Sequence, residues 1–457
     1  MQRDLTKGSI FHNVIYFAIP YLISCFLQTF YGLADLFITG QFNGAATVTA
    51  VSVGSQIMHM ITVIIVGLAM GTTVTVGMCI GEKNREKASD YIGNSIIIFS
   101  VMSIILTILT IVFSGKILIL LSTPAQAIAE TEKYIIVCFA GIPFITGYNV
   151  ISSIFRGMGD TKSPLIFVGI AGIVNIIGDY ILIGALNMGA LGAAVATVSS
   201  QACSVIIAVV ILLKRGNLVH ITMDSLKLKK EYVKKILIIG TPISFQDGLI
   251  QVSFLVITAI ANSRGVDVAA AVGIVEKIIS FLFLVPSAML STVSAIAAQN
   301  AGAGSHERAK STLYYGIRIC IVYGIITIIV CEPLASVIVS IFVKNEPKVV
   351  ILGAQYLRTY VFDCLFAGMH FCFSGYFSAY GKSIYSFIHN IISIVLMRIP
   401  GAYLASVFFP ATLYAMGIAA PAGSLLSVII CMYLYLKHGE LLWKSLRKLA
   451  LYHPSRH

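Results

Sequence analysis

The amino-acid sequence predicts an all-α integral membrane protein with twelve transmembrane helices in two six-helix lobes, related by a parallel pseudo-two-fold repeat. Three observations predict this fold. The 457 residues are 58% hydrophobic and only 11% charged, with a mean hydropathy of +0.93, which is far more apolar than a soluble domain. Apolar segments of about 20 residues, long enough to cross a bilayer, recur along the whole chain. The two halves of the chain also resemble each other.

Twelve apolar segments follow one another along the chain. Their centres lie near residues 26, 62, 102, 142, 173, 201, 247, 282, 322, 362, 395 and 425. The first segment has no small-residue cleavage site and is longer than a signal-peptide core, so we interpret it as a retained helix. The expected organisation is an N-lobe with helices 1–6 over residues 1–213, a basic cytoplasmic linker over 214–235, a C-lobe with helices 7–12 over 236–437, and a cytoplasmic C-terminal tail over 438–457.

An internal repeat relates the two halves. "GEKNREKA" at 81–88 corresponds to "GAGSHERA" at 302–309, and Pro20 of the first helix corresponds to Pro242 of the seventh, at offsets of 221 and 222. Matches at nearly one offset indicate a duplication. Six helices per half is an even number, so both halves enter the membrane from the same side. This arrangement is typical of transporters with a cavity between two lobes.

The distribution of basic residues predicts the orientation. With both termini inside, the cytoplasmic segments hold 22 Lys and Arg, against four in the outer loops: Lys116, Arg264, Lys344 and Lys348. This asymmetry follows the positive-inside rule. The net charge of +12 therefore reflects topology and does not indicate nucleic acid as a partner. The partner that it does indicate is the anionic lipid of the inner leaflet.

Polar residues within the apolar helices are the candidate functional residues. Asp179 lies in helix 5 with Asn175 one turn before it on the same face, and Asp35 of helix 1 and Thr197 of helix 6 are expected at a similar depth. Ionisable side chains inside a membrane are costly and mark functional sites. Their oxygens suit sodium, whereas two close carboxylates with little water around them could instead share a proton. The alternative is that these residues only hydrogen-bond neighbouring helices.

Four stretches resemble the multidrug and toxic compound extrusion (MATE) family: "YGLADLFITGQF", "GEKNREKA", "FRGMGDTKSP" and "FSAYGKS". The resemblance implies export of organic cations and amphipathic compounds by alternating access, driven by inward flow of sodium ions or protons. It also implies a coupling site at Asp35, Asn175, Asp179 and Thr197. No cofactor is expected apart from the coupling ion.

Two further residues of helix 4 are candidates for the same site. Asn149 fits the spacing of the family, but its position near Arg156 places it closer to the inner side of the membrane. Tyr134 lies near the outer end of the helix and has the better depth. Both stay in the predicted ion site.

The second half does not copy this site, because at the common offset Asp35 corresponds to Ile257, Asn175 to Met397 and Asp179 to Gly401. Ion coupling is therefore predicted to be one-sided. The C-lobe carries other charges at membrane depth, which are either internal ion pairs or functional groups: Asp247, Glu276, Lys277, Asp363 and Arg398. With the two N-lobe aspartates they sum to −3, which favours a cavity for cations. The predicted substrate cavity includes Gln28, Tyr31, Gln246, Asp247, Gln251, Glu276 and Met289.

Motifs of other protein classes were not found. The sequence contains no Walker-type phosphate loop, HExxH or GxSxG, so an ATP-driven pump or an enzyme is not expected. Nine cysteines without CxxC spacing argue against a metal site or a disulfide framework. The sequence predicts a secondary active multidrug efflux antiporter that acts as a monomer. Its predicted location is the plasma membrane of a bacterial cell. A flippase for a lipid-linked sugar is one alternative, and a channel or receptor-like membrane protein is another.

Overall fold

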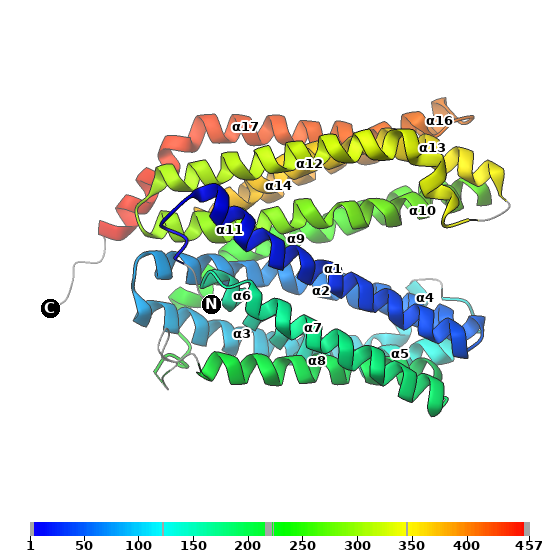
Figure 1. Ribbon diagram of the computed structural model, residues 1–457, viewed down its shortest axis with the longest axis horizontal. Helices are drawn as coiled ribbons and strands as arrows, with labels where there is room; N and C mark the ends of the chain where they lie inside the picture. Colours follow the sequence, from blue (N-terminus) through cyan, green and yellow to red (C-terminus); the bar gives the residue numbers. More distant parts are fainter. Residues whose placement is uncertain (1–3, 121–122, 215–221, 223, 344–345, 452–457) are drawn as a thin grey trace. The chain divides into compact units, whose positions relative to one another are not determined.

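The computed structural model describes residues 4–120, 123–214, 222, 224–343 and 346–451, with side chains described up to His438. These residues form helices and their connections, without a strand (Figure 1). The helices of the first half are α1 (Ile10–Phe42), α2 (Ala45–Gly81), α3 (Arg85–Val112), α4 (Ser114–Leu120), α5 (Ile128–Ala140), α6 (Ile142–Gly157), α7 (Lys162–Asp179), the π-helix η1 (Tyr180–Ala185) and α8 (Gly189–Lys214).

The second half follows the same order of long and broken helices. Its helices are α9 (Lys230–Asn262), α10 (Val266–Leu282), α11 (Leu284–Gly302), α12 (His306–Ser340), α13 (Pro347–Tyr360), α14 (Asp363–Ala379), α15 (Ile384–Ser393), the π-helix η2 (Ile394–Arg398), α16 (Ile399–Phe408) and α17 (Tyr414–Leu451). Eleven of the twelve predicted segment centres fall within one of these helices, and the centre at 362 falls at the break between α13 and α14. The predicted twelve-span helical fold is confirmed.

Two of the spans are broken, and they are the fourth of each half. Within the described residues, ten spans are formed without a sharp bend, while α5 and α6 meet at 47° and α13 and α14 at 41°. In the first half, Pro143 directly follows the break and cannot donate a backbone hydrogen bond to the preceding turn. In the second half, the break brings Asp363 to the first turn of α14.

The chain folds into two compact units. Unit 1 contains residues 1–4 and Tyr16–Gly240, and unit 2 contains Leu5–Ile15 and residues from Thr241 to the C-terminus. The helices α1 and α9 therefore each begin in one unit and continue in the other, with Pro20 and Pro242 shortly after the change. The lobe, linker and tail boundaries predicted above stay predictions, and part of the linker (215–221, 223) and of the tail (452–457) lies outside the described residues.

The start of each crossing helix is held within its own unit. In unit 2, the backbone carbonyls of Leu5 and Gly8 accept hydrogen bonds from Asn300 Nδ2 (3.3 Å) and Arg308 Nη2 (3.0 Å). In unit 1, Gly71 of α2 and Gly240 of α9 lie at a backbone-to-backbone contact, where an added Cβ would come within 2.2 Å of a carbonyl oxygen. Glycine permits such an approach because it has no side chain.

The π-helix η2 changes the repeat register by one residue. Helix α15 begins 222 residues after α7. Beyond η2, however, Gly401 contacts Ala419 as Gly178 contacts Ala196, with an added Cβ at 3.2 and 3.1 Å from the alanine Cβ, and both positions are offset by 223. A π-helix accommodates one extra residue per turn. The structural counterpart of Asn175 is therefore Arg398, which is 6% exposed, and not Met397, which is 39% exposed and which the constant offset had suggested.

Candidate functional site

Three of the predicted site residues form a hydrogen-bonded chain in unit 1. Thr197 Oγ1 of α8 donates to Asp35 Oδ2 of α1 at 3.1 Å, and Asn175 Nδ2 of α7 reaches Thr197 Oγ1 at 3.5 Å. Asp35 is 3% exposed and Asn175 is fully buried. Residues far apart in the sequence thus meet in one polar layer inside the first unit.

Asp179 completes this group. It is fully buried, and its carboxyl group lies beside that of Asp35, close enough for a hydrogen bond if one of the two carries a proton. Four buried oxygens of the group have no hydrogen-bond donor among the described residues: Asp35 Oδ1, Asn175 Oδ1 and both oxygens of Asp179. Leaving a buried carboxylate without a donor or a counter-charge is costly.

The electrostatics of the group favour a cation. Within the described part of the chain, no Lys, Arg or His side chain lies at ion-pair distance from Asp35 or Asp179. A hard monovalent cation or a proton would supply the positive charge that no described basic side chain provides here. The site is thus chemically able to hold a sodium ion through oxygens or to hold a proton on one carboxyl group.

A second layer of amide and phenol groups adjoins the carboxylates. Gln201 Nε2 of α8 donates to Tyr31 OH of α1 at 3.0 Å, and Gln28 Nε2 donates to Tyr148 OH of α6 at 3.2 Å. Gln28 and Tyr31 were predicted as cavity residues, whereas Gln201 and Tyr148 were missed. For Gln201 a signal existed in the sequence, since it lies one helical turn after Thr197 on the same face.

The two remaining candidates of the ion site differ in their surroundings. Tyr134 is buried on α5, and its hydroxyl group pairs with Ser55 Oγ of α2 at 3.1 Å while the ring lies within electrostatic range of Asp35. Asn149 Nδ2 donates at 2.8 Å to the carbonyl of Ile145 in its own helix. The structure thus places Tyr134 within electrostatic range of Asp35, and the side-chain hydrogen bond of Asn149 stays within its own helix.

The candidate cavity residues of unit 2 lie on three helices: α9, α10 and α11. Gln246 Nε2 donates to Asp247 Oδ1 at 3.4 Å and Gln246 Oε1 accepts from Ser374, while Asp247 and Gln251 are half-buried on α9. Glu276 accepts a hydrogen bond from Thr258. Met289 is 2% exposed and packs against α12 beside Gly316.

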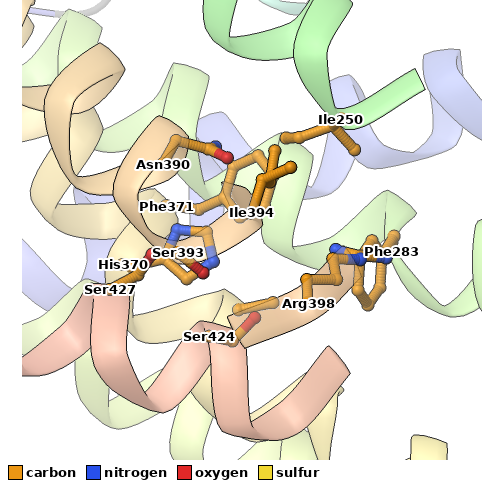
Figure 2. A pocket seen from close by; sticks show the side chains of 11 residues that line it. Ile250, Phe283, His370, Phe371, Asn390, Ser393, Ile394, Arg398, Ser424 and Ser427 are labelled. Atoms are coloured by element: carbon orange, nitrogen blue, oxygen red, sulfur yellow. The ribbon is translucent and has the colours of Figure 1, made fainter. Parts of the chain in front are cut away.

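Unit 2 also contains a small polar pocket, shown in Figure 2, with Arg398 as its charged wall. Its other polar walls include His370, Asn390 and Ser424. The rings of His370 and His389 lie 5.3 Å apart, and His389 Nε2 pairs with Ser374 Oγ at 2.9 Å. These histidines come from different helices, so sequence spacing did not reveal the pair.

Up to twelve apolar spans among the described residues, in two equivalent halves with a buried group of carboxylates in one of them, are typical of a membrane transporter. The MatE family model matches residues 20–181 and 242–404, one match in each half. The chain is 27% identical to the probable multidrug resistance protein YpnP of Bacillus subtilis, over 97% of this chain and 98% of that protein. It is 25% identical to an FAD transporter of Shewanella oneidensis, over 95% and 96%.

A solved structure of MATE in complex with MaL6 has the same fold, with a TM-score of 0.88, 23% identity and coverage of 97% of this chain and 99% of that one. The chain belongs to the MatE family, the multidrug and toxic compound extrusion transporters. It is therefore a multi-pass membrane transporter and not an enzyme. Membership also argues against the channel or receptor-like alternative.

Proposed function

We propose that this chain is a secondary active efflux antiporter, which exports organic cations and other amphipathic compounds in exchange for sodium ions or protons by alternating access. The observation that carries the proposal is the set of four buried, unpartnered oxygens around Asp35 and Asp179 without a basic side chain. An exchangeable cation is the simplest group that can satisfy them. Relatives named as multidrug resistance proteins support drugs as the exported class.

The orientation proposed with this function has both termini in the cytoplasm of a bacterial cell and the protein in the plasma membrane as a monomer. The excess of Lys and Arg in the segments assigned to the inside supports it. A flippase of lipid-linked sugars would need basic groups for phosphate, and among the described residues of unit 1 none lies at ion-pair distance from Asp35 or Asp179.

The first prediction concerns the two carboxylates. In inverted or reconstituted vesicles, ethidium transport should collapse when the driving ion gradient is removed. Sodium and proton gradients are dissipated one at a time, which identifies the coupling ion. Asp35→Asn and Asp179→Asn should each lower gradient-dependent transport at least about tenfold, because a neutral amide can neither hold a proton nor neutralise sodium.

A matched control is Asp267→Asn. Asp267 lies in the first turn of α10, partly exposed, and pairs with Lys348 at 2.6 Å. Its substitution should leave transport unchanged. Gradient-dependent transport that persists in Asp35→Asn with the same ion dependence would overturn the proposed site, and gradient-independent movement of ethidium would overturn the antiport mechanism. Transport of FAD or a lipid-linked sugar in place of ethidium would redirect the substrate class.

A further inference from the structure

Arg398 is a guanidinium group buried inside unit 2. It ends the π-helix η2, and its Nη2 donates to the hydroxyl group of Tyr360. Its guanidinium also lies 4.8 Å from the ring centre of Phe254, at a cation–π distance. The donor Nε is buried and has no acceptor among the described residues. A phenol and a ring do not neutralise this charge.

The charges that can neutralise it are two carboxylates of the same unit. Asp363 and Glu276 both interact electrostatically with Arg398. Neither lies within 4 Å of it as a direct ion pair in the described structure. Ser424 lies near Asp363, but Glu276 Oε1 and both oxygens of Asp363 have no donor at hydrogen-bond geometry among the described residues. Lys277 directly follows Glu276 on α10, but its side chain is exposed and does not belong to this group. The two histidines nearby, His370 and His389, are both buried.

The internal repeat relates Arg398 to a residue of the ion site in unit 1. Because η2 adds one residue, Arg398 occupies in the second half the position that Asn175 occupies in the first. In unit 1 this position holds a neutral amide, which reaches Thr197 and Asp35 and brings no fixed positive charge. In unit 2 it supplies a positive charge to two carboxylates that come from α10 and α14. The two halves thus differ in how the negative charge of their buried carboxylates is balanced.

We infer that Arg398 is a tethered cation, which takes in unit 2 the place that the exchangeable ion takes in unit 1. Without its guanidinium, unit 2 becomes a binding site for a small monovalent cation, such as sodium or free guanidinium, between Glu276 and Asp363. The comparison of Arg398 with the exchangeable ion of unit 1 rests on the function proposed above. The charge balance within unit 2 does not depend on that function. Removing one member of a buried ionic group leaves the others uncompensated and is strongly destabilising, whereas replacing the whole group by neutral residues is often tolerated.

The test measures the melting temperature of purified, full-length protein with a thiol-reactive dye, since seven of the nine free cysteines are buried and become accessible on unfolding. In a buffer whose only cation is the bulky N-methylglucamine, Arg398→Gln should melt about 5–10 °C below wild type. Millimolar guanidinium or sodium should raise the melting temperature of this variant selectively, because a ligand of the folded state stabilises it. The matched control Lys277→Gln should neither melt earlier nor respond.

A triple variant keeps the inference falsifiable if Arg398→Gln folds poorly. Arg398→Gln combined with Glu276→Gln and Asp363→Asn should recover most of the lost melting temperature and should lose the response to cations. Glu276→Gln with Asp363→Asn in the presence of Arg398 should instead be destabilised, since the guanidinium is then alone.

Two results would overturn the tethered cation: no selective response of Arg398→Gln to either cation, or no recovery in the triple variant. Failure of the proposed function has a different signature. In that case Asp35→Asn would leave ion-dependent transport intact, while the behaviour of the Arg398 variants would be as stated.

Discussion

At the scale of single residues, Thr197 joins two helices through one hydroxyl group. It donates to Asp35 of α1 and lies at hydrogen-bond distance from the amide of Asn175 of α7. The hydroxyl therefore fixes the orientation of one carboxylate and of one amide at the same time. Any ion that binds between them meets oxygens that are already positioned.

Thr197→Val tests this role, since valine preserves the shape of the side chain and removes the hydroxyl group. One hydrogen bond is worth about 0.5–1.5 kcal/mol, so the apparent affinity for the coupling ion should fall roughly two- to tenfold. The measurement is the ion concentration that gives half-maximal ethidium transport.

Thr62→Val is the control for the threonine prediction, because the Thr62 hydroxyl bonds only to the carbonyl of Met58 in its own helix. It should leave the ion dependence unchanged. An unchanged ion dependence in Thr197→Val would show that the hydroxyl does not position the ligands of the ion.

Much of the unit 1 site was predictable at this scale. Depth counting along each helix placed Asp35, Asn175, Asp179 and Thr197 in one layer, and the structure brings them together. Asn149 was the weaker candidate on the same count, and its amide bonds within its own helix. Partners that depend on how helices face each other, such as Tyr148 for Gln28, leave no spacing in the sequence and could not be predicted.

At the scale of elements, the contact of α2 with the start of α9 depends on two glycines. A side chain at Gly71 would meet the carbonyl oxygen of Ile236, and one at Gly240 would meet that of Leu68, each at 2.2 Å. Backbone atoms cannot move aside as a flexible side chain can. The first turns of α9 are held in unit 1 by this close approach.

Gly71→Ala should therefore force the two helices apart and destabilise the protein by about 1–3 kcal/mol, the usual cost of overpacking. The melting temperature and the yield of monodisperse protein should both fall. Gly169→Ala on α7 is the control, since nothing lies within 4 Å of its added Cβ. It should be neutral or stabilising by up to about 1 kcal/mol, because alanine favours a helix. Equal effects of the two substitutions would contradict the close contact.

The elements themselves were predictable to different degrees. Hydropathy located all twelve spans, because each must be apolar over its length. The break after α5 has a signal in Pro143, but the break after α13 falls at Val361 and Phe362, which are ordinary helix residues. The π-helix η2 has no local signature either. Its effect on the register lies in tertiary contacts, since Gly401 makes the contact of Gly178 at an offset of 223.

At the scale of the whole molecule, the equivalent helices α1 and α9 each begin in one unit and continue in the other, which is an exchange of their first turns. The N-terminal segment Leu5–Ile15 belongs to unit 2, where Asn300 and Arg308 hold its carbonyls. The repeat was predictable from the offsets of short motifs. This exchange was not, because it depends on tertiary contacts and not on the order of the helices.

Arg308→Ala should loosen the N-terminal segment without unfolding unit 2. A hydrogen bond from a charged group is worth about 1.5–3 kcal/mol, so amide hydrogen exchange of residues 5–13 should accelerate at least about tenfold. Arg358 of α13, which bonds to Glu332, provides the control Arg358→Ala, which should leave this segment unchanged. Unaltered exchange in Arg308→Ala would mean that other contacts anchor the segment.

The one-residue insertion accommodated by η2 also bears on how such a protein can arise. A duplicated gene starts with two identical halves, and any site in one is present in the other. A single residue added to one copy and taken up by a π-helix shifts the numbering beyond it by one, while the residues that follow keep their contacts, as Gly401 and Ala419 do, and all twelve spans are retained. Asymmetry between the halves then requires no new fold and no loss of a helix. It requires one insertion, taken up within η2, and a different residue at one buried position, Arg398.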